Sequence, residues 1–237
     1  HRDLHSFSTR RSSDLVVAIR VISIPLTLYS IKTELNTIIK YSSGRLVADF
    51  FLFSLSAFPL IYISNALDLQ QTAYYSVGIT FVTMVTPLYS FMGIILLPFI
   101  SESVANHQLQ KANQFVNKLA LVYLFSSGAI SAFIYIFINY FTSFFFSDNY
   151  LITTDLSRIM ILAILPQAIY LLFRNPIDAI SAIPYNTLIL GISLLVMILA
   201  FTHSHTIYEY AWAYFLVSLF QGTLSWLTWL HLKRKKV

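Results

Sequence analysis

The chain has 237 residues, of which 57% are hydrophobic and only 11% are charged, and its formal net charge is +5. Soluble domains carry roughly 25% charged residues, so this composition excludes an ordinary soluble protein. The chain has no cysteine, which excludes disulfides and cysteine-ligated zinc sites. Three of the fifteen Lys and Arg residues lie near the start and four form the run at 233–236. This uneven distribution does not suit a nucleic-acid-binding surface, and we expect no nucleic-acid partner.

The first fifteen residues differ from everything that follows, because they are polar and have no apolar face. No Met precedes Met84, and the segment lacks the order of basic, apolar and cleavage regions that defines a signal peptide. Residues 1–15 resemble the translated sequence of a common DNA-sequencing adapter, with Ser8 where that sequence usually has Pro. We therefore expect them to be non-native and the natural protein to be longer, this chain being its C-terminal part. A disordered basic arm is the alternative.

Seven apolar stretches follow, most of them near the 20 residues that a helix needs to cross a bilayer. The first, at 16–31, is short. Six whole spans come after it, at 46–64, 73–100, 119–140, 158–180, 184–202 and 208–230. A buried soluble core produces one such run but not seven in series. The sequence therefore predicts an all-α, polytopic transmembrane protein with one truncated helix and six whole ones.

The connections between these spans alternate between basic and non-basic, and basic connections normally lie in the cytoplasm. The basic connections are the first, the third and the C-terminal tail, with Lys32, Lys40, Arg45, Lys111, Lys118 and the run at 233–236. The second and sixth connections carry no Lys or Arg, and the fourth offers only Arg158 at the start of a span. We therefore expect a cytoplasmic segment at 32–45 and a cytoplasmic C-terminus.

Three motifs carry a family resemblance: "RLVADFFLFSL" opens a span, "LLPFISE" closes the next one, and "LLFRNPIDAISAIPYNT" joins two later spans. From about residue 46 to the end, the chain resembles the second half of bacterial polysaccharide exporters. These are lipid-linked oligosaccharide flippases, in the superfamily that also contains the MATE drug exporters and the lipid II flippase. The order and spacing of the motifs support the resemblance more than any one of them does.

This resemblance implies a MATE-like architecture of two six-helix bundles, which move a substrate by alternating access. Residues 16–31 would end helix six of an N-terminal bundle, 32–45 would be the cytoplasmic linker, and 46–237 would be the C-terminal bundle. The implied activity is a transporter rather than an enzyme, without a cofactor, in the bacterial cytoplasmic membrane. The implied partners are the lipid bilayer, a polyprenyl-pyrophosphate-linked glycan, and other polysaccharide assembly proteins.

An anionic head group needs cationic side chains in a water-filled cavity, and Arg20 is the first candidate. It precedes Lys32 by twelve residues, about 18 Å along a helix, which places it near the middle of a bilayer core of about 30 Å. A midplane arginine costs at least about 2.5–3.5 kcal/mol, so it usually faces an interior. The alternative is an ion pair with a carboxylate on another helix.

Five further residues are candidates for the substrate path or its gate. Arg174 and Asp178 have the i, i+4 spacing that allows pairing on one helix face, although Arg174 near a span end can also snorkel to lipid headgroups. Gln167 either lines the cavity or forms an interhelical hydrogen bond, and the same holds for Gln221. Asp49 is a candidate for a gate or for ion coupling. Its alternative is a favourable interaction with the helix dipole in the first turn of its span.

Two other functions stay open. A MATE-type drug or cation exporter would favour carboxylates inside the membrane, whereas the carboxylates here lie at the ends of spans. A membrane polysaccharide polymerase would be expected to carry long outer loops, and the outer connections here are short and nearly uncharged.

Overall fold

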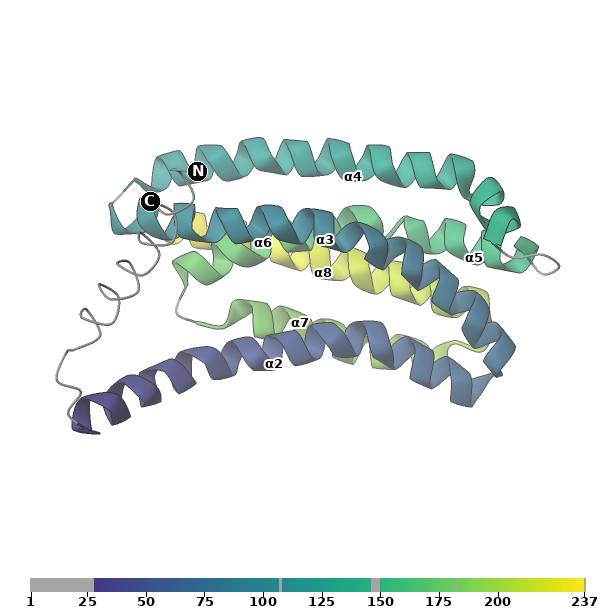
Figure 1. Ribbon diagram of the computed structural model, residues 1–237, viewed down its shortest axis with the longest axis horizontal. Coiled ribbons are helices and arrows are strands. Elements are labelled where there is room, and N and C mark those ends of the chain that lie inside the picture. Colours follow the sequence, from purple (N-terminus) through teal and green to yellow (C-terminus); the bar gives the residue numbers. More distant parts are fainter. Residues whose placement is uncertain (1–27, 107, 146–149, 182, 237) are drawn as a thin grey trace, which may run out of the picture. The chain divides into compact units, whose positions relative to one another are not determined.

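In the computed structural model the described residues are 28–106, 108–145, 150–181 and 183–236, so the prediction for Arg20 lies outside them. These residues form helices and no strand, which confirms the all-α prediction (Figure 1). The helices are α2 (Leu28–Ala66), α3 (Leu69–Ala105), α4 (Leu109–Phe145), α5 (Tyr150–Ile161), α6 (Ile164–Ile180), α7 (Tyr185–His203) and α8 (Ile207–Lys236).

The chain divides into two compact units, His1–Gly44 and Arg45–Val237, and the second contains the packed bundle. Helix α2 begins at Leu28, so the segment expected as a cytoplasmic linker is helical and continues directly into the next span. This continuity corrects one expectation. Asp49 lies in the interior of α2 rather than in a first turn, where the unpaired N–H groups of a helix start would be available to it.

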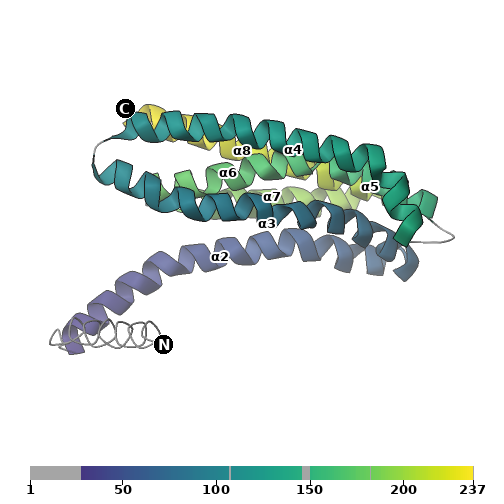
Figure 2. The same ribbon diagram turned by 45° about the horizontal axis from the view of Figure 1, so that its top comes forward.

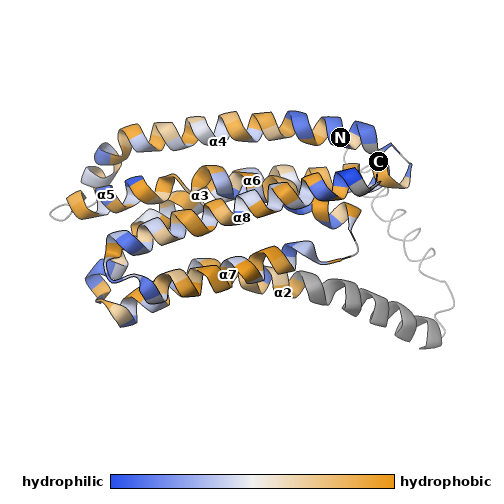
Figure 3. Cartoon of the chain, turned by 180° about the vertical axis from the view of Figure 1, so that it is seen from behind, coloured by the Kyte–Doolittle hydropathy of each residue, from blue (hydrophilic) through white to orange (hydrophobic). Residues whose placement is uncertain are grey.

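In the part of the chain that the structure describes, five helical segments are long and apolar enough to cross a membrane, which supports a multi-pass membrane protein. They are Leu46–Ala66, Leu69–Ala105, Gln110–Phe145, Leu151–Ile180 and Tyr185–His203. Figure 3 shows hydrophobic residues along the middle of the helices and hydrophilic residues gathered at their ends. The span expected at 208–230 forms the 30-residue helix α8, which is less apolar because it contains polar residues and ends in the basic run at 233–236. Its polar residues Ser218, Gln221 and Ser225 are buried inside the bundle.

The span expected to start at Arg158 begins earlier, at Tyr150, and is interrupted at Leu162 and Ala163 between α5 and α6. Pro166 explains the interruption, because proline cannot donate a hydrogen bond to the carbonyl four residues before it and its ring clashes with that carbonyl. Within the break, Leu162 and Ala163 instead donate to carbonyls three residues back. The Ser131 hydroxyl of α4 donates to the carbonyl of Ile161 at 3.1 Å. A neighbouring side chain thus satisfies a backbone group exposed by the break, as membrane helices require.

Helix α6 lies at the centre of the Arg45–Val237 unit, packed against α3, α4 and α8 (Figures 1 and 2). Its backbone approaches α8 so closely that a Cβ on Gly222 would lie 2.5 Å from the carbonyl oxygen of Pro166. Helix α2 packs differently, through large side chains. Phe58 and Tyr62 contact Phe201 of α7 with ring centroids 5.6 and 5.8 Å apart, and Tyr62 also contacts Tyr210 of α8 at 5.9 Å. These large rings lie between the backbone of α2 and its neighbours, and they leave room between α2 and the central helices.

Charged residues are distributed unevenly between the two ends of this unit. The α3–α4 turn, the α6–α7 turn and the end of α8 lie at one end, on the left in Figure 1. Every Lys and Arg from Arg45 onward, except Arg158, lies at or near that end. At the opposite end, Asp68 caps α3 by accepting from the Gln71 backbone at 2.6 Å. The opposite end is therefore poor in positive charge.

Candidate functional site

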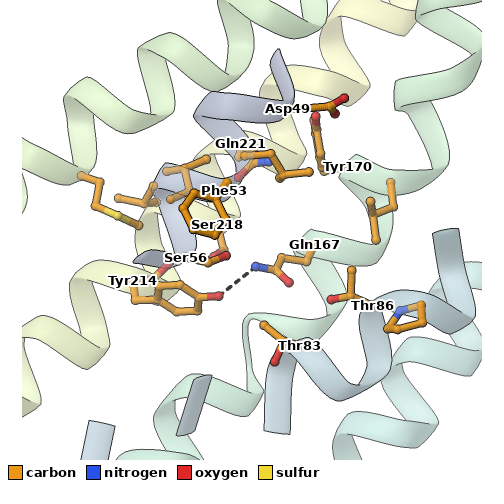
Figure 4. A pocket seen from close by; sticks show the side chains of 16 residues that line it. Asp49, Phe53, Ser56, Thr83, Thr86, Gln167, Tyr170, Tyr214, Ser218 and Gln221 are labelled. Carbon is orange, nitrogen blue, oxygen red and sulfur yellow. Dashed lines mark hydrogen bonds between the residues drawn. The ribbon is translucent and has the colours of Figure 1, made fainter. Parts of the chain in front are cut away.

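A cavity of about 400 Å³ lies among α2, α3, α6, α7 and α8 (Figure 4). Its lining residues are Asp49, Leu52, Phe53, Leu55, Ser56, Thr83, Thr86, Pro87, Gln167, Tyr170, Leu171, Met197, Tyr214, Val217, Ser218 and Gln221. Phe53 is 70% exposed and the side chain of Asp49 is 59% exposed, so the cavity opens to the surface beside α2. All of these lining residues belong to helices that cross the membrane or lie among those that do.

The cavity wall combines two chemistries. Leucine, methionine, valine, proline and phenylalanine side chains form an apolar part, and hydroxyl and amide groups form a polar part. Among the described lining residues, Asp49 alone carries a formal charge. Ligand sites commonly have this character, a mostly apolar wall with a few placed polar groups.

Gln167 is held in place by a hydrogen bond across the bundle. Its Nε2 donates to the hydroxyl of Tyr214 on α8 at 2.9 Å. Tyr214 is itself buried, and its ring meets the ring of Tyr75 on α3 edge to face, with centroids 6.4 Å apart. The amide is therefore oriented by two neighbouring helices before any ligand arrives.

Several hydroxyl groups in the cavity donate hydrogen bonds to backbone carbonyls of their own helices. Thr83 donates to the carbonyl of Ile79 at 3.0 Å, and Ser218 donates to the carbonyl of Tyr214 at 2.9 Å. Each oxygen keeps lone pairs available as acceptors. Tyr170 differs, because its hydroxyl has no hydrogen-bond partner among the described residues although the side chain is only 1% exposed. Such buried, unpartnered groups are rare in native structures and call for an explanation.

Asp49 forms an ion pair and hydrogen bond with Arg174, which joins α2 to α6 near the basic end of the unit. The Arg174 side chain is 19% exposed and is the more buried partner. Asn186 of α7 donates at 2.7 Å both to the backbone carbonyl of Arg174 and to the carboxylate of Asp178. Three helices therefore converge on this charged cluster, and the positive charge of Arg174 is balanced by Asp49.

The predicted site residues divide clearly by position. Gln167, Asp49 and Gln221 line the cavity. Arg174 and Asp178 do not line it, and they lie on α6 towards the basic end of the unit. Arg174 forms its ion pair with Asp49 rather than with Asp178 of its own helix, because α2 brings the Asp49 carboxylate within reach.

Sequence reasoning missed the hydroxyl groups of the cavity, which come from Ser56, Thr83, Thr86, Tyr214 and Ser218. Their signal in the sequence is weak. Hydroxyl residues in a membrane helix usually bond to their own backbone, so only the packing reveals which of them face a cavity.

A second cavity, of about 320 Å³, lies between α4, α6 and α8. Its wall is almost wholly apolar, and its polar side-chain groups are the indole N–H of Trp226 and the Thr223 hydroxyl, which donates to the carbonyl of Phe220 at 2.9 Å. It offers a polar ligand far fewer partners than the cavity beside α2 does. The candidate site is therefore the cavity beside α2.

No family model, curated protein or solved structure matches this chain. Its function must be inferred from its own residues. Within the described part of the chain, no group of three or more His, Cys, Asp or Glu residues is placed to hold a metal ion.

Proposed function

We propose that this protein is part of a membrane transporter that moves a polyprenyl-pyrophosphate-linked oligosaccharide across the bacterial cytoplasmic membrane. The observation that carries the proposal is the cavity beside α2. It lies within the membrane-spanning part, it opens to the surface, and its wall joins uncharged hydrogen-bonding groups to an apolar surface. The family resemblance of the sequence supports the same substrate class.

The physical requirement is set by the substrate, which has a sugar head and a long hydrocarbon tail. Sugar hydroxyls that leave water without new partners cost several kcal/mol, so the path must offer donors and acceptors. Thr83, Gln167, Ser218 and Gln221 provide such groups in the cavity. The tail needs no polar path and stays in lipid. No covalent bond changes, so the site requires no nucleophile.

The proposed orientation follows from the charge distribution. The basic end of the Arg45–Val237 unit carries Lys111, Lys118 and Arg234, and basic connections normally face the cytoplasm. The α3–α4 turn and the C-terminus would then be cytoplasmic, as would the ion pair between Asp49 and Arg174.

Genetic complementation tests this proposal. The protein is expressed from its complete gene in a bacterium that lacks its own polysaccharide flippase, and surface glycan is measured. We expect the wild type to restore glycan and Gln167→Ala to restore much less at equal membrane abundance. Gln110→Ala is the matched control, because Gln110 is exposed near the start of α4 and outside the cavity. Failure of the wild type in hosts with several different glycans would reject the substrate class.

A cation exporter is the second candidate, and one observation favours it. The carboxylate of Asp49 lines the cavity and is 59% exposed, so it can attract a cation although its Oδ1 is paired with Arg174. If this candidate is right, cells expressing the protein export a cationic dye and Asp49→Asn abolishes that export. If the glycan proposal is right, dye accumulation does not change.

A further inference from the structure

We infer that the cavity beside α2 binds one uncharged, hydroxyl-rich ring, and that Tyr214 is the residue that positions Gln167 to receive it. The inference rests on the proposed function for the identity of the whole substrate. It adds which part of that substrate this bundle holds, namely a sugar ring rather than the phosphates.

The amide of Gln167 is held in one orientation. Because its Nε2 donates to Tyr214, the carbonyl oxygen points away from that partner, to the side of Thr83 and Thr86 (Figure 4). Tyr214 is fixed in turn by burial and by the ring of Tyr75. An amide held in this way presents an acceptor in one direction, and a ligand loses little entropy in finding it.

The hydroxyl groups of the cavity wall mainly offer acceptors to a ligand. Thr83 and Ser218 donate to backbone carbonyls, so towards a ligand they offer acceptors, as the Gln167 carbonyl also does. An acceptor-rich wall selects a ligand that brings its own donors, such as hydroxyl or amide groups. A phosphate group is mainly an acceptor and carries negative charge, and the lining offers it amide N–H donors such as those of Gln221 but, among the described residues, no cationic side chain. Arg174 is already paired with Asp49.

The hydroxyl of Tyr170 marks the end of the cavity towards Asp49. It is buried and lacks a partner among the described residues, although the residue belongs to the cavity lining. In Figure 4 it lies beside Asp49 and away from the Gln167 amide, so it adds no contact to a ring held at Gln167.

The shape of the site agrees with a ring. Phe53 of α2 is 70% exposed, and it forms an apolar surface beside the polar groups (Figure 4). A sugar ring has hydroxyls at its edge and C–H groups on its face, so it can satisfy both surfaces. A volume of 400 Å³ lies within the range of about 300–1,000 Å³ that is usual for ligand pockets, so the cavity has room for one hexose.

The experiment measures binding and does not depend on transport. The full chain is purified in lipid nanodiscs, and methyl glycosides are titrated at millimolar concentrations, with binding followed by saturation-transfer NMR. Inorganic pyrophosphate and tetraphenylphosphonium serve as the anionic and cationic probes. We expect a glycoside to bind, Gln167→Ala to abolish binding, and Tyr214→Phe to weaken it by about 3- to 10-fold, the effect of one oriented hydrogen bond.

Tyr123→Phe is the matched control, because its buried hydroxyl donates to the carbonyl of Tyr89 at 2.7 Å and Tyr123 does not line the cavity. A positioning role also predicts a change in selectivity. The preference for the glycoside over the deoxy analogue that lacks the contacted hydroxyl should collapse in Tyr214→Phe and persist in Tyr123→Phe.

Two results would overturn the inference. Binding of pyrophosphate or tetraphenylphosphonium without glycoside binding would show that the cavity holds a charged group. A Tyr214→Phe protein with wild-type selectivity would show that Tyr214 only stabilises the fold. Glycoside binding by a protein that fails the complementation test would support the ring site and reject the transport proposal, so the two failures are distinguishable.

Discussion

The close approach of α6 and α8 makes a sharp prediction for Gly222. In Gly222→Ala the added Cβ would lie 2.5 Å from the carbonyl oxygen of Pro166 and 3.2 Å from its carbonyl carbon and Cα. Non-bonded carbon contacts settle at about 3.5–4.0 Å, so the two helices must separate by about 1 Å. All three contacted atoms are backbone, and no side-chain rotation relieves the clash.

The magnitude follows from two opposing effects. Overpacking of this kind costs about 1–3 kcal/mol, and the better helix propensity of alanine returns about 0.5–1 kcal/mol. We therefore expect Gly222→Ala to lower the free energy of unfolding by about 1–2 kcal/mol. Gly128 on α4 is the matched control, because a Cβ there meets nothing within 4 Å. Gly128→Ala should show only the effect of the better helix propensity of alanine, and it should raise the free energy of unfolding by about 0.5–1 kcal/mol.

Thermal unfolding in detergent, followed by tryptophan fluorescence, measures the difference. All three tryptophans of the chain lie on α8, the helix that Gly222 belongs to. At about 2–4 °C per kcal/mol, the midpoints of the two alanine variants should differ by roughly 5–10 °C. If Gly222→Ala unfolds at or above the temperature of Gly128→Ala, α6 and α8 are not in backbone contact and the packing described here is wrong.

Three smaller effects are expected from single contacts. Ser131→Ala should destabilise the protein by about 0.5–1.5 kcal/mol, because the carbonyl of Ile161 loses its interhelical donor at the break before α6. Thr206→Ala should cost about 1 kcal/mol, because Thr206 and Glu209 cap the start of α8 reciprocally. A double-mutant cycle of Asp49→Asn and Arg174→Gln should give a coupling of about 1 kcal/mol, kept modest by the exposure of Asp49.

The same unfolding assay checks each of these three effects. Ser143→Ala is the control for Ser131, because the Ser143 hydroxyl is exposed and bonds within its own helix. Thr228→Ala is the control for Thr206, since Thr228 bonds to the carbonyl four residues back inside α8. Equal effects in a variant and its control would mean that the named contact contributes nothing. Additive effects of Asp49→Asn and Arg174→Gln would mean that the ion pair contributes nothing to stability.

The helical, membrane-spanning character was predictable because it depends on local composition. A run of about 20 apolar residues can leave water only as a helix that satisfies its own backbone. The break before α6 was harder to place. Pro166 marks it in the sequence, yet proline is common in membrane helices, and whether it interrupts one depends on partners such as Ser131.

The candidate site was predictable only in part. Gln167 and Asp49 stood out because polar groups inside apolar spans are unusual, and both line the cavity. The charged pairing was not predictable from spacing, because Arg174 meets Asp49, which is 125 residues away in the chain, through the packing of α2 near α6.

The sequence alone determined that this protein is helical, that it has several apolar spans, and that its positive charge gathers at alternate connections, because these properties depend on residue type and order. Only the tertiary structure decided which polar groups share a cavity. Thr83, Gln167, Tyr214 and Ser218 come from three helices, and each looks alone like an ordinary helix-bonded side chain. Their convergence depends on how closely α3, α6 and α8 pack, which glycines such as Gly222 permit and no local pattern encodes.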